Sequence, residues 1–442
     1  MSDNSALTHL ATGRLILEEG IPRHDPFSFT AAGEPWTVYS WLASVVYALA
    51  ERAAGANGLQ LVRALLTTIL AAVAWRLTAP AGALAGRILA VASILVIGTS
   101  AWTERPLLIA LVLLGVVVLL AEQEGRPRPL VMAGTMWVWV NVHGTFPLAL
   151  VYLGTRLVGR RLDGLPAGRL RTLTFAALAG TLAGALNPLG PRLLVFPFRL
   201  LARHDLLQHV QEWRSPRFSD PPNLAFLFIL LAALVLGTRR RSFEDALVAG
   251  VFGASAALGV RNVPFAALVL MPVLARGLTG FGTAHGGERN AVTAAGTLSI
   301  GVAACALLVT SWRAPAYDLD RYPVRQVRWM QEQGLLQRRV ATQDFVGNYL
   351  IARRGREANV FFDDRYDLYP RPVIRDAIAL HNGDEGWQRR LDTYGIEVVL
   401  WERSRPLASL VSLDPGWRVV RRDARWVVAV RRAEGPSRRS AS

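Results

Sequence analysis

The chain has 442 residues, of which 52% are hydrophobic and 19% are charged, and its net charge is +16. Soluble domains contain about a quarter charged residues, so this composition excludes a disordered chain or a collagen-like fibre and argues against an ordinary soluble enzyme. The single cysteine, Cys305, excludes an intrachain disulfide and a cysteine-rich metal site.

The N-terminal segment, 1–58, differs from the apolar central part of the chain. Residues 1–36 are polar with a net negative charge and do not show the pattern of a signal peptide. The stretch 37–54 is rich in aromatic residues such as Trp41, which favours an amphipathic helix lying at the membrane interface. Two alternatives stay open: this stretch crosses the membrane itself, or a first membrane helix lies upstream of Met1.

Long apolar runs fill residues 59–311, with arginine mostly between them. A membrane-spanning helix needs about 20 mainly apolar residues. A buried helix of a soluble core would explain any single run, but such runs in series predict about ten membrane spans. The expected spans are 59–75, 84–100, 106–121, 130–142, 143–158, 173–190, 222–237, 245–259, 262–277 and 292–311.

The arginines between the runs predict an orientation, because short cytoplasmic loops of membrane proteins carry an excess of cations. The loop 155–172 holds five arginines against one acidic residue, and 239–241 is three arginines in a row. With both loops in the cytoplasm, alternation places 101–105, 191–221 and 260–261 on the outer side. It places both chain ends there as well.

The C-terminal segment is strongly charged, since 313–442 contains 24 of the 49 arginines and 17 of the 33 acidic residues. Short apolar strands alternate with helices, which predicts a soluble α/β domain with a mixed sheet over 313–432. We expect a disordered tail over 433–442. The first expected helix has helical periodicity over 325–337 and ends at Gly334; the others are 387–394 and 407–413. The expected strands are 340–342, 359–362, 397–401, 417–420 and 426–430.

The most distinctive motif lies between His9 and Trp36. It reads Gly-Arg-Leu-Ile, then Ile-Pro-Arg-His-Asp-Pro-Phe-Ser-Phe-Thr, then Pro-Trp. It resembles the opening of a group of bacterial multi-span proteins in the GT-C superfamily of glycosyltransferases, which are mannosyltransferase-like and use polyprenyl-phosphate sugars. The resemblance implies a catalytic Asp in an outer segment, with Asp3 and Asp25 as candidates to take the proton of an acceptor hydroxyl. Asp25 followed by Pro26 would equally fit a turn that caps a surface loop.

The chain departs from the pattern of this group at three places. Ser5 replaces a second Asp, Leu7-Thr8 replace a Trp pair, and Tyr39-Ser40 replace a His-Glu pair. These departures favour the competing hypothesis that the protein is not catalytic.

The resemblance continues through the membrane part. Ionisable groups within spans are costly and tend to face polar cavities, and arginine suits the binding of phosphate. We therefore expect one outward-facing cavity in which Arg105, His143, Arg192 and Arg261 bind the donor phosphate and Glu212, Trp213 and Asn187 support the acceptor. The alternatives are arginines that extend to lipid headgroups, a histidine that only packs, and an asparagine that ends a helix.

The C-terminal domain matches the same group in its Gly347-Asn348-Tyr349 and Asp363-Asp364-Arg365-Tyr366-Asp367 stretches. Asp363, Arg365 and Asp367 would lie together at a strand tip and support acceptor binding. The carboxylates could hold a divalent cation, or they could form an ion-pair network with Arg365 that fixes a loop.

Together these features predict an α-helical polytopic membrane protein with GT-C-like architecture and a C-terminal soluble α/β domain. The implied location is the bacterial cytoplasmic (inner) membrane, with the C-terminal domain extracytoplasmic. The implied activity transfers a sugar from a polyprenyl-phosphate donor to an envelope glycan, lipid or protein. The competing hypothesis is an envelope lipid transporter or an assembly factor whose outer domain binds a partner. The scattered arginines argue against nucleic acid.

Overall fold

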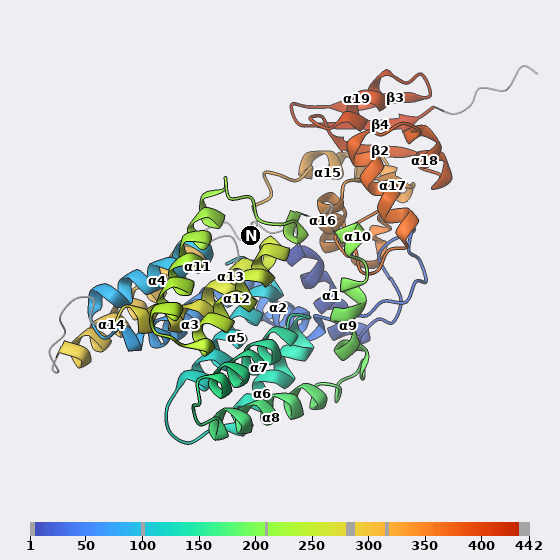
Figure 1. The fold of residues 1–442 in the computed structure, drawn as a ribbon. Coiled ribbons are helices and arrows are strands. Elements are labelled where there is room, and N and C mark those ends of the chain that lie inside the picture. Colours follow the sequence, from blue (N-terminus) through green and yellow to red (C-terminus); the bar gives the residue numbers. More distant parts are fainter. Residues whose placement is uncertain (1–4, 99–101, 208–210, 280–287, 314–317, 433–442) are drawn as a thin grey trace, which may run out of the picture. The chain divides into compact units, whose positions relative to one another are not determined.

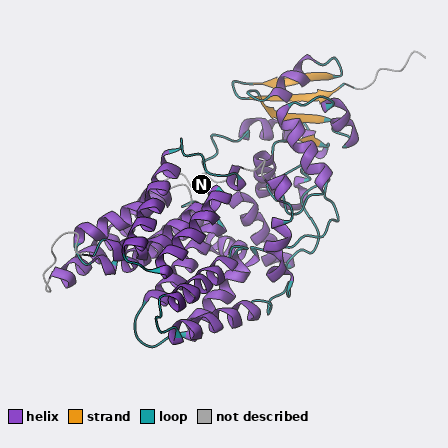
Figure 2. Ribbon diagram, viewed as in Figure 1, coloured by secondary structure: helices purple, strands orange, loops and turns teal. Residues whose placement is uncertain are grey.

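The structure, a computed structural model, describes residues 5–98, 102–207, 211–279, 288–313 and 318–432 and is mostly helical (Figures 1 and 2). Asp3 and the expected tail 433–442 lie outside these residues. The chain divides into two compact units. We call them the helical unit, which contains Thr37–Tyr317, and the sheet unit, which combines Asn4–Trp36 with Asp318–Ser442. The segment 1–58 is therefore not one piece, because most of its first 36 residues belong with the C-terminal domain.

The helical unit contains a helix within each of the ten predicted apolar runs. Proline occupies the first position of several of these helices, where its missing N–H is not needed. The described helices are α2 (Trp41–Ala54), α3 (Gly58–Leu77), α4 (Leu84–Gly98), α5 (Pro106–Glu122), α6 (Pro129–Val142), α7 (Pro147–Leu162), α8 (Gly168–Ala183), α9 (Arg192–Leu201), α10 (His204–Leu207), α11 (Pro221–Arg239), α12 (Phe243–Leu258), α13 (Val263–Gly277) and α14 (Glu288–Arg313).

Three helical stretches in the described ranges are long and apolar enough to cross a membrane: Trp41–Ala81, Pro221–Arg239 and Val260–Gly277. The first of them includes α2, so the stretch expected to lie at the interface is part of a longer apolar helical segment. Shorter apolar helices occupy Pro106–Glu122, Pro129–Val142 and Ala294–Leu307. The chain thus has membrane-like helical character, while these lengths by themselves do not establish ten spans.

Two of the helix pairs in this unit approach so closely that glycine is required. A Cβ on Gly180 of α8 would lie 2.2 Å from the carbonyl oxygen of Ala133 in α6. A Cβ on Gly159 of α7 would lie 2.3 Å from the Cα of Glu244 in α12. The second contact sets α7 beside the start of α12, where a group of charged side chains meets.

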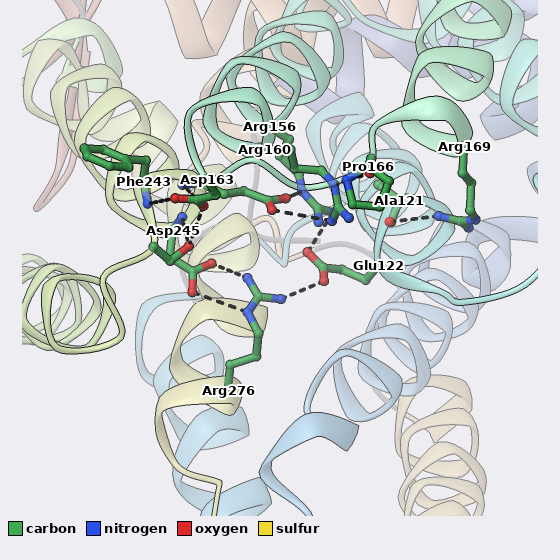
Figure 3. Close-up of polar contacts among 12 residues, drawn as sticks. Ala121, Glu122, Arg156, Arg160, Asp163, Pro166, Arg169, Phe243, Asp245 and Arg276 are labelled. Atoms are coloured by element: carbon green, nitrogen blue, oxygen red, sulfur yellow. Dashed lines mark hydrogen bonds and ion pairs between the residues drawn. The ribbon is translucent and has the colours of Figure 1, made fainter.

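That group, which we call the helix-end ion network, joins α5, α7, α12 and α13 (Figure 3). Arg156 pairs with Glu122 at 2.9 Å and with Glu244 at 2.5 Å. Arg276 pairs with Glu122 at 2.7 Å and with Asp245 at 2.5 Å. The alternating charges leave each of these buried or half-buried groups paired, which removes most of the penalty of taking them out of water.

Side chains from neighbouring helices also cap two helix ends in this region. Asp163 accepts hydrogen bonds from the backbone N–H groups of Phe243, at 2.7 Å, and of Glu244, at 3.0 Å, at the start of α12 (Figure 3). Arg169 donates to the carbonyl oxygens of Leu120 and Ala121 at the end of α5. An anion at a helix N-terminus and a cation at a helix C-terminus both interact favourably with the helix dipole, so these contacts stabilise the two helix ends.

The sheet unit has a four-stranded mixed sheet, as predicted for the C-terminal segment. The strand order is β1-β2-β4-β3, with β1 parallel to β2 and the other neighbours antiparallel. Its elements are α1 (Ser5–Glu19), α15 (Val324–Glu332), β1 (Val340–Ala341), α16 (Asp344–Arg354), α17 (Arg371–Asn382), α18 (Trp387–Thr393), β2 (Val398–Glu402), α19 (Pro406–Leu413), β3 (Trp417–Arg422) and β4 (Trp426–Arg431).

The helix expected to end at Gly334 does end there: α15 stops at Glu332, Gly334 adopts a left-handed conformation with a φ of 68°, and a 3-10 turn follows over Leu335–Gln337. One expected element of this unit differs from the structure. The strand expected over 359–362 is not in the sheet; Val360 forms an isolated parallel bridge with Ser28. The backbone of Val360 is instead paired with the N-terminal segment, which the sequence pattern had placed in a different domain.

Candidate functional site

Three loops meet at one end of the helical unit. Arg105 precedes α5, Glu212 and Trp213 lie in a 3-10 turn before α11, and Arg261 lies in the turn between α12 and α13. Arg105 donates to the carboxylate of Glu212. The guanidinium carbon of Arg261 lies 4.3 Å from the ring centroid of Trp213, which is a cation–π contact. We call these four residues the arginine site.

The two arginines of this site have different surroundings. Arg105 is paired with Glu212, whereas no carboxylate in the described ranges pairs with Arg261. Arg261 is partly buried and lies close enough to Arg105 for the two cations to repel each other. A desolvated guanidinium without an acidic partner is suited to bind an anion, and its planar group matches a phosphate.

An aromatic group extends from this site. Tyr39 stacks on Phe196 of α9 with ring centroids 4.2 Å apart, and it meets His143 edge-on at 6.2 Å. The Tyr39 side chain also interacts electrostatically with Arg261. His143 itself pairs through Nδ1 with the Thr145 hydroxyl at 2.9 Å, so its ring orientation is fixed. The expected group of Arg105, His143, Glu212, Trp213 and Arg261 is thus connected through direct contacts and Tyr39.

Glu104 is the residue that sequence analysis missed. Its side chain is fully buried and forms an ion pair with Arg63 of α3 at 2.8 Å. This contact does not have hydrogen-bond geometry, and neither carboxylate oxygen accepts a hydrogen bond from the described residues. A buried carboxylate left with unused acceptor capacity requires an explanation, such as a ligand or an ordered water. Its position directly before Arg105 and Pro106 was the available signal.

Two expected residues do not join the site. Arg192 begins α9 and is exposed. Asn187 forms the turn after α8: its side-chain nitrogen donates to the carbonyl oxygen of Gly190 at 3.2 Å, and its side-chain oxygen accepts from the N–H of Leu189 at 2.6 Å. These contacts are those of a residue that shapes a helix end, which was the alternative interpretation.

The expected acidic residues of the sheet unit form a buried network around Arg365. This guanidinium donates to both carboxylate oxygens of Asp363, at 2.8 and 2.7 Å, and to Asp25 at 2.8 Å. The rings of Trp36 and Phe27 lie 4.6 and 5.1 Å from it. Burial lowers the pKa of Arg365, but the nearby carboxylates, Asp363 above all, raise it well above its usual value.

Asp25 is also occupied on its own side of the network, because it accepts hydrogen bonds from the backbone N–H groups of Phe27, at 3.1 Å, and of Ser28, at 3.0 Å. Asp25 therefore fixes a turn and joins two distant parts of the chain. Asp363 also accepts a hydrogen bond from Tyr369 at 2.6 Å. Asp367, further along the loop, is partly exposed.

These contacts also bear on the expected divalent cation. The carboxylates of Asp25 and Asp363 are used by Arg365, so they do not fit a metal ion. Within the ranges that the structure describes, no group of three or more His, Cys, Asp or Glu side chains is placed to hold one.

No protein-family model matches the chain, and a search of curated proteins finds no match to its sequence.

Proposed function

We propose that the protein is a polytopic membrane transferase that moves a sugar from a polyprenyl-phosphate donor to a hydroxyl of an envelope acceptor. The observation that carries this proposal is Arg261, a partly buried cation that lacks an acidic partner among the described residues and lies beside Arg105. Arg261 is the second residue of Val260–Gly277, one of the apolar helical stretches that can cross a membrane. A lipid-linked phosphate carries the negative charge that the Arg261 guanidinium lacks as a partner, and it lies at the membrane surface, where a spanning helix would begin.

The division into units supports an even number of crossings. Asn4–Trp36 and Asp318–Ser442 belong to one compact unit, so the chain enters and leaves the helical unit on the same side of the membrane. An even number of crossings agrees with the ten spans expected from the sequence.

Because successive helices run in alternating directions, the loops that carry the residues of the arginine site all fall on one side of the membrane. The loops at Arg105, Glu212 and Arg261 meet at one end of the helices, and the helix-end ion network gathers at the opposite ends of α5 and α13. The arginine-rich segment 155–172, expected as a loop, comprises the end of α7, a short turn and the start of α8, and it lies beside that network. With this segment in the cytoplasm of a bacterial cell, the arginine site faces outward.

The proposed reaction forms a bond between the acceptor oxygen and the anomeric carbon of the sugar. The bond from that carbon to the phosphate oxygen breaks, and polyprenyl phosphate leaves with the electron pair. Arg261 and Arg105 hold the phosphate as its charge develops. Glu104 takes the proton of the acceptor hydroxyl, because its carboxylate has acceptor capacity that Asp25 does not have.

The deciding experiment measures transfer of radiolabelled sugar from a panel of polyprenyl-phosphate sugars in membranes that contain the full-length protein. Transfer that depends on Arg261, but not on the exposed Arg171, is the expected result. No transfer from any donor of the panel would exclude the transferase and favour the non-catalytic alternative.

A further inference from the structure

The two parallel strands of the sheet unit, β1 and β2, end next to each other. Ala341 is in register with Val399, so the residues after β1 lie beside the end of β2. The side-chain oxygen of Gln343 accepts a hydrogen bond from the N–H of Glu402 at 3.1 Å, which fixes this edge. In α/β proteins, the carboxyl ends of parallel strands are where loops and helix N-termini collect binding side chains.

Asp344 begins α16 at this edge and is the centre of a polar group. Tyr366 is hydrogen-bonded to its carboxylate, and His381 of α17 interacts with the same carboxylate. Arg405 also interacts electrostatically with His381. Asp344, Tyr366 and His381 are partly exposed and Arg405 is exposed, so solvent reaches all four.

Asn348 adds an unused donor. It lies one turn after Asp344 and therefore on the same face of α16. Its side-chain oxygen accepts from the N–H of Asp364 at 3.2 Å, which places the amide group against the loop that carries Tyr366. Asn348 is fully buried, yet its side-chain nitrogen has no hydrogen-bond partner among the described residues. The hydroxyl of Thr342, directly after β1, is also buried and has no hydrogen-bond partner among the described residues.

We propose that this group, the Asp344 cluster of Asp344, Asn348, Tyr366, His381 and Arg405, binds a neutral carbohydrate. A sugar hydroxyl both donates and accepts hydrogen bonds, so it needs an acceptor and a donor side by side, as Asp344 and His381 provide. The charges of Asp344 and Arg405 offset each other, and Asp363, Asp364 and Glu402 nearby disfavour a simple anion. The partly exposed Tyr366 ring offers an apolar face.

Protonation supports this assignment. Burial, followed by the charge of Arg405, lowers the pKa of His381, so its imidazole is neutral at pH 7 and can donate at one nitrogen and accept at the other. Burial raises the pKa of Asp344. Exchange of this carboxylate for an amide therefore removes a costly charge and is compatible with folding. The cluster lies entirely in the sheet unit, and its assignment does not depend on the transferase proposal.

The test uses the full-length protein in nanodiscs, titrated by calorimetry with maltotetraose, mannotetraose and cellotetraose. We expect saturable binding of at least one of them. Asp344→Asn and His381→Ala should each weaken this binding about tenfold or more, whereas Asp384→Asn, a change at an exposed position of the same unit, should not. Thermal unfolding of each variant verifies that it is folded.

A second readout uses chemical modification of histidine by diethyl pyrocarbonate, followed by mass spectrometry. The chain has seven histidines, and only His381 should be protected by the bound oligosaccharide. Absence of binding by all three sugars would overturn the proposal. Binding that persists unchanged in both cluster variants, or protection at other histidines instead, would overturn it too.

Discussion

The guanidinium of Arg261 stacks on the indole of Trp213, 4.3 Å from the ring centroid, and has no acidic partner among the described residues. The neighbouring Arg105 is paired with Glu212, so the two cations of the arginine site differ in their availability for a ligand. This difference gives the proposed function its first test.

Arg261→Gln should weaken binding of the polyprenyl-phosphate donor about tenfold or more, because one charge-assisted contact to phosphate is lost. Arg261→Lys should recover only part of the affinity, since an ammonium group does not match phosphate with two parallel bonds. The measurement is donor affinity in nanodiscs, with Arg171→Gln as the control for a general loss of positive charge. Equal affinities for all variants would remove Arg261 from the donor site.

Glu104→Gln should lower kcat about a hundredfold while leaving donor affinity unchanged, because an amide cannot take a proton from the acceptor. The protein should stay folded, since Arg63, left without its partner, is about one-third exposed and can reach water. Initial rates at saturating donor measure this effect, and Glu124→Gln at an exposed position is the matched control. A full rate for Glu104→Gln would show that another group takes the proton.

Arg156→Ala should destabilise the helical unit by about 3–5 kcal/mol, because Glu122 and Glu244 would each lose a buried cation. Arg161 is exposed on the same helix, so Arg161→Ala should change stability by less than about 0.5 kcal/mol. Thermal or denaturant unfolding in detergent compares the two. Similar stabilities would mean that the helix-end ion network contributes little to the fold.

Lowering the pH should destabilise the sheet unit through His381. Its pKa is lowered in the folded state by burial and by Arg405, so the unfolded chain binds the proton more strongly, with a pKa of about 6.5. The stability that comes from keeping this group neutral is present above that value and is lost as the pH falls below it. Hydrogen exchange of the sheet unit at pH 7.5 and pH 5 measures this change. In His381→Gln, the dependence over this interval should be smaller; an identical dependence would exclude His381 as its source.

The topology can be tested because Cys305 is the only cysteine. In a Cys305→Ala background, Asp220→Cys precedes α11 on the proposed outer side, and Arg171→Cys lies in the first turn of α8 on the proposed cytoplasmic side. A maleimide that does not cross membranes should label the first variant in intact spheroplasts and the second only after lysis. The reverse pattern would invert the proposed orientation.

The elements that depend on local sequence were predicted correctly. Runs of apolar residues that begin with proline, such as those at Pro106 and Pro221, are helices in the structure, because proline fixes the start of a helix and apolar side chains favour burial. The final hairpin was also predicted, since alternating residues on either side of Asp423 pair locally. Crossing of a membrane depends on length and surroundings as well, and the local pattern does not establish it.

The sites were harder to predict because their partners are distant in the chain. Asp25 and Arg365 are separated by 340 positions, and a motif read along the sequence cannot distinguish a catalytic carboxylate from one that is paired. For Glu104 the sequence offers only its position before Arg105 and Pro106; its burial and its incomplete set of hydrogen bonds are visible only in the structure. For Arg105, Glu212 and Arg261, by contrast, the alternation of helices was enough to expect them at the same end.

The sheet unit is built from both ends of the chain, with about 280 residues between its two parts. At a synthesis rate of roughly 5–20 residues per second, α1 leaves the ribosome on the order of 15–60 s before α16, the helix on which it packs. During that interval the apolar face of α1, including Leu7 and Leu10, has no partner from the C-terminal part. Translation that stops before α16 would leave this face uncovered, so cells could recognise and degrade incomplete chains by their N-terminal helix.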